Sequence, residues 1–249
     1  MIFKKNHLDS PFKTSWSDPA SLDYAKKQLI DTKESTKSFC SFIKENIEDL
    51  DNNKLLDLGC GAGGATLYLA EHLGKSIDIL GIDNDPILIT LAKTNANGRV
   101  AFKVGEISDL NLDSAFDGVF SIHTLMCLPN FQEPILEILL KVRPKWLAIS
   151  SLFYPGEISA STVIRENVKN RSVFYNTYSI PEVNRFVSDY GYSVTKVKKF
   201  EMPFDLPNLA TADELGTYTV LISNSEIDKR LQISGPVLMN WYFILIEKS

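Results

Sequence analysis

LLDLGCGAGGAT, which spans residues 55–66, is the stretch that decides the fold of this chain. It begins with a short apolar run that carries one acid, Asp57, and such a run is typical of a buried strand. Glycines follow, and residues 65–70 favour a helix. A strand, a glycine turn and a helix together aim backbone N–H groups at one small anionic group, and glycine allows a ligand to approach closely. The stretch therefore predicts a ligand-binding turn.

The composition limits the class of protein. The chain has 249 residues, of which 44% are hydrophobic and 23% are charged. That length suits a single α/β domain with embellishments and is short for two full domains. The formal net charge is −5, which disfavours a nucleic-acid partner because affinity for nucleic acid comes mostly from Lys and Arg. We therefore expect one domain, residues 1–249, that acts without nucleic acid.

Cysteine usage and apolar runs bear on the location of the protein. Cys40, Cys60 and Cys127 are widely spaced and form no C-x-x-C pair, so we expect neither a disulfide framework nor a metal site. Such usage is typical of a reducing, cytoplasmic compartment. The first residues lack the apolar core of a signal peptide, and no run is long enough to span a membrane. We therefore expect no membrane partner.

Strands and helices are predicted to alternate through the first three fifths of the chain. The expected strands are 55–58, 77–83, 100–104, 116–122 and 146–150, with helices at 19–29 and 33–46 and from residues 65, 86 and 134. This alternation predicts an α/β fold with a doubly wound, mostly parallel seven-stranded sheet. Right-handed crossovers bring the carboxyl ends of its strands to one edge, where ligands bind.

The last third of the chain departs from this rhythm. Residues 153–181 are rich in aromatic side chains, and we expect them to form an irregular substrate cover. Residues 182–249 are expected to add a helix, a hairpin insertion and an antiparallel edge strand. An N-terminal helical cover at residues 1–50 and a cofactor-binding core at residues 51–152 complete the expected domain.

The glycine pattern alone fits two cofactors. Gly59, Gly61 and Gly64 satisfy G-x-G-x-x-G, and Asp83 follows at about the distance found in dinucleotide-binding folds. A nicotinamide-dependent oxidoreductase is therefore an open alternative. Asp57 counts against it, since a carboxylate just before the first glycine would repel a diphosphate but would suit an ammonium and a sulfonium.

Four segments, taken together and in order, resemble the motifs of the S-adenosylmethionine-dependent methyltransferases of the Rossmann-like class, class I. The segments are Asp57–Gly63, Gly81–Pro86, Val104–Ile107 and Phe116–Ser121. They cover roughly residues 50–152, and the set is specific at the level of the superfamily. The resemblance implies S-adenosyl-L-methionine as the cofactor and S-adenosyl-L-homocysteine as the product.

The resemblance also implies where the cofactor binds. Gly59 and Gly61 would hold the methionine part through backbone contacts, and Cys60 would fill the turn between them. Asp57 would lie near the amino group of that part. Asp83 would take both ribose hydroxyls.

Further contacts are implied beyond this turn. Glu106, where the family more often has Asp, would face the adenine amino group, and Ile107 would pack on the adenine ring. The positions that would flank or close the site are Asn84, Ser121, Trp16 and Tyr24.

The chemistry needs few protein groups. Methyl transfer from a sulfonium is an in-line displacement, so the enzyme contributes mainly orientation, and a general base is needed only where the nucleophile arrives protonated. His123, just past the fourth strand, is the candidate base, and Glu157 is a second candidate. A packing or loop-capping role for His123 is the alternative.

We expect a methyl group to be transferred to an O or N atom of a small-molecule acceptor. The segment SIHT, residues 121–124, lacks the Asn/Asp-Pro-Pro-aromatic pattern of amide and base amino methylation. Tyr154, Tyr175 and Tyr178 are expected either to line a ring-shaped acceptor or to form the core of the cover. Protein side-chain methylation, the nicotinamide-dependent oxidoreductase and a non-catalytic S-adenosylmethionine-binding protein are the alternatives.

Overall fold

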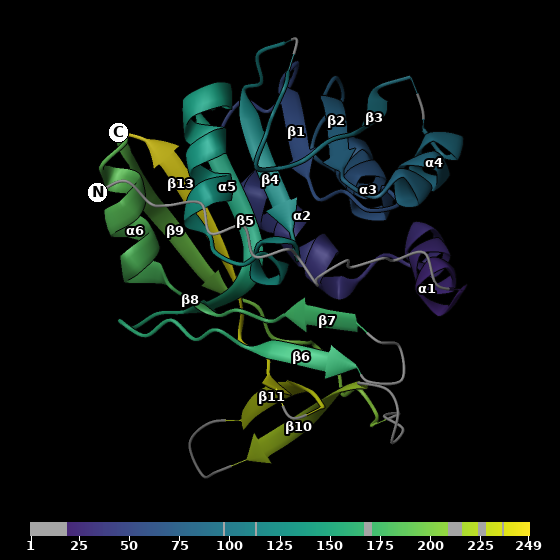
Figure 1. The fold of residues 1–249 in the computed structure, drawn as a ribbon, viewed down its shortest axis with the longest axis vertical. Coiled ribbons are helices and arrows are strands. Elements are labelled where there is room, and N and C mark those ends of the chain that lie inside the picture. The colour runs from purple at the N-terminus through teal and green to yellow at the C-terminus, as the bar shows by residue number, and fades with distance from the viewer. Residues whose placement is uncertain are drawn as a thin grey trace.

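A mixed sheet forms the centre of the molecule (Figure 1). The computed structural model describes residues 19–96, 98–112, 114–166, 171–208, 216–223, 228–235 and 237–249. Within these residues the sheet runs β3-β2-β1-β4-β5-β13-β9, and β8 pairs with the end of β5. Its strands are β1 (Lys54–Leu58), β2 (Asp78–Asp83), β3 (Val100–Val104), β4 (Gly118–Ile122), β5 (Trp146–Tyr154), β8 (Tyr178–Ser179), β9 (Tyr192–Lys199) and β13 (Trp241–Lys248). The strands from β3 to β5 are parallel, which confirms the predicted fold class.

The antiparallel strand lies one place inside the edge of the sheet. β13 is antiparallel to β5 on one side and to β9 on the other. The chain passes from β5 through α6 (Ile180–Ser188) to β9, which then runs parallel to β5. The last strand fills the place between them, so β9 and not the antiparallel strand forms that edge.

Helices cover both faces of the sheet and give it two hydrophobic cores. They are α1 (Pro19–Ile30), α2 (Glu34–Asn46), α3 (Gly64–His72), α4 (Pro86–Thr94) and α5 (Gln132–Glu137), besides α6 and the turns η1 (Leu125–Cys127) and η2 (Ile138–Val142). Phe39 of α2 packs in one core with Phe243. Val183 of α6 packs in the other core with Ile244. Phe243 and Ile244 are neighbours on β13, and side chains of a strand alternate between its faces.

Two small sheets complete the described part of the chain. They are the hairpin of β6 (Val163–Glu166) and β7 (Arg171–Phe174), and the sheet of β10 (Thr217–Ser223), β11 (Asp228–Ser234) and β12 (Val237–Leu238). The hairpin expected within residues 182–249 is thus confirmed as β10–β11. The expectation that residues 153–181 are irregular is wrong, because Val163 pairs with Phe174 and Ile164 with Val173.

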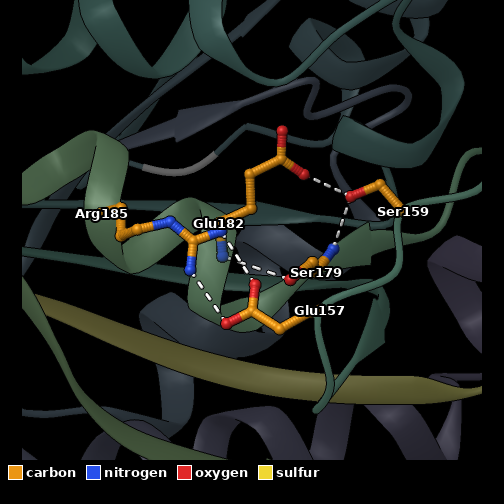
Figure 2. A network of polar contacts seen from close by, with 5 residues as sticks. All are labelled: Glu157, Ser159, Ser179, Glu182 and Arg185. Carbon is orange, nitrogen blue, oxygen red and sulfur yellow. Dashed lines mark hydrogen bonds and ion pairs between the residues drawn. The ribbon is translucent and has the colours of Figure 1, made fainter.

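Polar contacts tie the segment after β5 to α6, as Figure 2 shows. Arg185 makes two hydrogen bonds with Glu157, at 2.9 and 2.8 Å. Ser179 caps α6 by accepting a hydrogen bond from Glu182 N at 3.2 Å. Ser159 Oγ donates to Glu182 and accepts from Ser179 N. These contacts hold one end of the connection that carries β6 and β7.

The described residues contain neither a helix able to span a membrane nor a cluster of metal-ligating side chains. No helix there is long and apolar enough to cross a membrane. No group of three His, Cys, Asp or Glu side chains in the same part of the chain is placed to bind a metal ion.

Candidate active site

The glycine turn between β1 and α3 depends on left-handed backbone. Gly59, Gly61 and Gly63 have φ values of 79°, 55° and 85°, a region that glycine adopts readily and other residues rarely do. A Cβ atom on Gly59 would lie 2.1 Å from Thr124 Oγ1, and one on Gly63 would lie 2.5 Å from Phe102 Cζ. The turn therefore needs glycine both for its conformation and for its close packing.

Asp83, at the end of β2, braces this turn. Its carboxylate accepts hydrogen bonds from Gly61 N at 2.8 Å and from Asp85 N at 3.0 Å. Burial raises the pKa of Asp83, and the backbone hydrogen bonds act against that rise. Asp85 in turn caps α4 by accepting from Ile87 N and Leu88 N. The two acids thus fix the ends of β1 and β2 side by side.

Asp57 is a buried acid inside β1. Its side chain is 2% exposed and accepts a hydrogen bond from Thr66 Oγ1 at 2.6 Å. Burial raises the pKa of Asp57 to about 7, although the hydrogen bond from Thr66 acts in the opposite direction. A cation beside a buried carboxyl of this kind favours its charged form.

A cavity of about 630 Å³ lies at the carboxyl edge of the sheet. That volume lies within the range of small-molecule sites. The structure brings most of the predicted site residues to its wall. They are Tyr24, Asp57, Gly59, Cys60, Gly61, Asp83, Asn84, Glu106, Ile107 and His123.

Two predicted residues do not line the cavity, and a third lies outside the described residues. Ser121 does not line the cavity, because its buried hydroxyl donates to Leu58 O at 2.8 Å and so ties β4 to β1. Glu157 also lies away from the cavity wall and is paired with Arg185. Trp16 lies outside the described residues.

His123 has an unusual backbone and a buried ring atom. Its φ is 59°, its N–H donates to Ser150 O at 2.8 Å, and its ring centroid lies 4.2 Å from that of Trp241. Among the described residues nothing forms a hydrogen bond with His123 Nε2. Burial, and to a lesser degree Lys33, hold the pKa of His123 well below its usual range. The imidazole is therefore neutral at pH 7.

Several residues that line the cavity were not predicted from the sequence. They are Lys33 and Thr36 of the α1–α2 region, Thr124 and Cys127 after β4, Glu133 of α5, and Ser172, Val173 and Phe174 of β7. Tyr154, Tyr175 and Tyr178, which were expected either to line the acceptor site or to form the core of the cover, are absent from the lining. Tyr178 instead donates to Leu128 O at 3.0 Å. Contacts between segments distant in the sequence place these residues, and no sequence motif predicts such contacts.

Comparison with known proteins agrees with this geometry. A family model described as a methyltransferase domain matches residues 49–198. Protein 235L of Invertebrate iridescent virus 6, assigned as a methyltransferase, is 25% identical over 81% of this chain and 78% of its own length. The ubiquinone biosynthesis O-methyltransferase of Rickettsia bellii is 28% identical over 63% of this chain and 68% of its own length.

One relative matches over a shorter region, and one solved structure shares the fold. The malonyl-[acyl-carrier protein] O-methyltransferase of Bacillus cereus is 31% identical over 41% of this chain and 38% of its own length. The magnesium protoporphyrin IX methyltransferase of Synechocystis PCC 6803, solved with bound SAH, superimposes with a TM-score of 0.61 at 12% identity. The superposition covers 94% of this chain and 97% of that structure.

Proposed function

Because the chain belongs to the methyltransferase domain family, we propose that this S-adenosylmethionine-dependent enzyme transfers the methyl group to an oxygen or nitrogen atom of a small molecule. The observation that carries the proposal is that one cavity is lined both by strand-end carboxylates and by a histidine with a hairpin strand. Carboxylates from the ends of β1, β2 and β3 line one part, while His123 and β7 line another. With the family established, the nicotinamide-dependent oxidoreductase is no longer an alternative.

The strand-end residues fit the cofactor. The buried Asp57 carboxyl favours a cation beside it, and the ammonium of the methionine part is such a cation. Asp83 presents two oxygens that already accept backbone hydrogen bonds and retain acceptor capacity for the two ribose hydroxyls. Glu106 and Ile107 extend the wall toward the adenine. When bound, S-adenosylmethionine supplies a methyl group activated on a sulfonium.

His123 is the residue that we assign to the acceptor. A neutral imidazole can take the proton that leaves a hydroxyl or an amine during methylation. Since protein encloses Nε2, the ring must turn toward the cavity before that nitrogen can act. The alternative, in which the ring only packs on Trp241, predicts a loss of stability without a specific loss of turnover.

The relatives favour a small acceptor. Two of them are named for O-methyl transfer, and β7 closes part of the cavity wall with Ser172, Val173 and Phe174. In this proposal residues 51–152 hold the cofactor, residues 1–50 and 153–181 cover it and the acceptor, and residues 182–249 complete the sheet. Protein side-chain methylation is the second candidate, and a panel of acceptors separates the two.

The first experiment measures ligand binding by isothermal titration calorimetry. S-adenosylhomocysteine is expected to bind the wild-type protein and NAD is not. Asp83→Ala is expected to lose most of this affinity, because it removes the ribose acceptor and a brace of the turn. Binding of NAD without binding of S-adenosylhomocysteine would refute the proposal.

The second experiment measures turnover with labelled S-adenosylmethionine. The acceptors are phenols, carboxylic acids and amines on one side and a mixed set of peptides on the other. Methylation of a small molecule supports the proposal, and methylation confined to peptides contradicts it. His123→Phe keeps an aromatic ring against Trp241, so it is expected to retain cofactor affinity and lose turnover. Unchanged turnover would remove His123 as the base.

A further inference from the structure

Two adjacent serines of β5 carry buried hydroxyls without a hydrogen-bond partner. Ser150 and Ser151 are both fully buried, and within the described residues neither Oγ is paired. The same is true of His123 Nε2. Buried polar side-chain atoms are normally paired, and an unpaired hydroxyl in a core costs stability that alanine would not. A role for one of these hydroxyls is therefore expected.

Ser150 and the imidazole of His123 lie on the same face of the sheet. The residues two places before and after Ser150 on β5, Ala148 and Leu152, belong to one hydrophobic core. Trp241 belongs to the same core, and the His123 ring lies against it with a centroid distance of 4.2 Å. Alternate residues of a strand share a face, so the Ser150 hydroxyl points to the side on which the imidazole lies.

The two residues are also neighbours in the sheet. Ser150 is paired with Ile122 of β4 and with Phe243 of β13, and both of these side chains are apolar. His123 directly follows Ile122, and its N–H donates to Ser150 O at 2.8 Å. The imidazole is therefore the polar side chain that this pairing brings to Ser150.

The two ring nitrogens of His123 have different surroundings. His123 lines the cavity, yet protein encloses its Nε2 atom. Nδ1 has no partner among the described residues either, but it is not one of the buried unpaired atoms, so it is the nitrogen open to the cavity. A neutral imidazole carries one proton, and only the other nitrogen can accept another. Nδ1 can thus act as a base without a turn of the ring, provided that Nε2 keeps the proton.

We propose that Ser150 is a positioning residue whose hydroxyl accepts a hydrogen bond from His123 Nε2–H and so leaves the lone pair on Nδ1, at the cavity. The inference rests on the proposed function, in which His123 is the base. The acceptor oxygen or nitrogen attacks the methyl carbon, the electron pair of the broken C–S bond stays on sulfur, and the acceptor proton passes to Nδ1. The hydrogen bond to Ser150 then stabilises the imidazolium, because hydrogen bonds from charged donors are the stronger ones.

The first test locates the proton by NMR and needs no acceptor. The chain has three histidines, so ¹H–¹⁵N correlation spectra of the histidine-labelled protein contain few ring signals, and His123→Phe assigns those of His123. At pH 7.5 the wild type is expected to carry the proton on Nε2. Loss of one hydrogen bond in Ser150→Ala is expected to lower the ratio of the Nε2–H form to the Nδ1–H form about fivefold.

The second test measures turnover with the small molecule that the acceptor panel identifies. Ser150→Ala is expected to lower kcat about 10-fold, because the imidazolium loses a hydrogen bond. The acceptor KM and the affinity for S-adenosylhomocysteine are expected to stay within about twofold, since Ser150 touches neither ligand. Ser150→Thr returns the hydroxyl and is expected to restore both kcat and the tautomer ratio. Ser150→Val has nearly the shape of threonine without the hydroxyl and is expected to restore neither.

Ser151→Ala is the matched control. Ser151 is as buried and as unpaired as Ser150, but its neighbours Ile149 and Phe153 on β5 belong to the opposite core. Its hydroxyl therefore points away from the imidazole. The same atom is removed from the same strand, and both kcat and the tautomer ratio are expected to stay within about twofold of the wild type.

Two results would overturn the role of Ser150. One is a tautomer ratio that does not change in Ser150→Ala. The other is an equal change in Ser150→Ala and Ser151→Ala, which would mean a general disturbance of β5. Full turnover in His123→Phe would instead contradict the base assignment, and a wild type that does not bind S-adenosylhomocysteine would contradict the cofactor, so these failures are distinguishable.

Discussion

Cofactor affinity is expected to fall as the pH drops below 7, because Asp57 must be ionised to attract the ammonium of the cofactor. Burial outweighs the hydrogen bond from Thr66 and raises the pKa of Asp57 to about 7. A bound ammonium stabilises the carboxylate and lowers that pKa. Binding therefore releases a proton from each molecule in which Asp57 is protonated beforehand.

The size of the effect follows from the ionised fraction of the free enzyme. With a pKa of about 7, roughly one molecule in ten carries an ionised Asp57 at pH 6, and about three in four do at pH 7.5. The apparent dissociation constant rises in inverse proportion to the competent fraction. S-adenosylhomocysteine is therefore expected to bind about eightfold more weakly at pH 6 than at pH 7.5.

Calorimetric titration across this pH range tests the prediction. Measurements in two buffers of different ionisation enthalpy count the protons released at each pH. The control ligand is 5′-methylthioadenosine, which has the same nucleoside but no ammonium. It should retain the contacts with Asp83, and burial also raises the pKa of Asp83. The control variant is Asp57→Asn, which is expected to bind more weakly and to lose the pH dependence.

Equal affinity for S-adenosylhomocysteine at pH 6 and pH 7.5 would refute this reasoning. An identical pH dependence for the two ligands would also refute it, because the titrating group would then serve the nucleoside and not the amino acid.

Three further predictions concern the scaffold. Gly59 has a left-handed φ and no room for a Cβ atom, so Gly59→Ala is expected to lower the free energy of unfolding by about 1–3 kcal/mol in urea titrations. A Cβ atom on Gly98 would have no neighbour within 4 Å, so Gly98→Ala is expected to leave the urea midpoint nearly unchanged. Asn176→Ala is expected to cost on the order of 1–3 kcal/mol, because it leaves buried backbone groups unpaired, and to raise the acceptor KM while the affinity for S-adenosylhomocysteine stays the same. Arg185→Ala is expected to leave the urea midpoint unchanged, since Arg185 and Glu157 are both exposed and exposed ion pairs contribute little.

The cofactor half of the site could be predicted because its signals are local. An apolar run, an acid at its end and a glycine turn are all read from adjacent residues. Parallel strands then bring Asp57, Asp83 and Glu106 to one edge without further information. The structure places these three at one cavity, and the family match independently covers the same region.

The rest of the site depends on contacts between distant segments. Ser121 follows the strand-end pattern, yet its hydroxyl is engaged by Leu58 O, 63 residues earlier. Lys33 precedes every motif and reaches the cavity only because α1 folds back over the glycine turn. Nothing in the sequence near either residue indicates these contacts, so the sequence alone could not predict which of the two lines the cavity.

Hydrogen bonds of Asn176 join the two segments that we assign to the acceptor, the loop after β4 and the β6–β7 hairpin. Asn176 N donates to Met126 O at 3.0 Å, and its side chain donates to Leu128 O at 2.9 Å and accepts from Thr162 N at 3.1 Å. One fully buried amide thus joins the loop after β4 to the β6–β7 hairpin, and both segments line the cavity. In the proposed function the cofactor would instead contact groups that the parallel sheet positions. Substitutions on β7 should therefore change acceptor choice without changing cofactor affinity, since the two walls are positioned by separate sets of contacts.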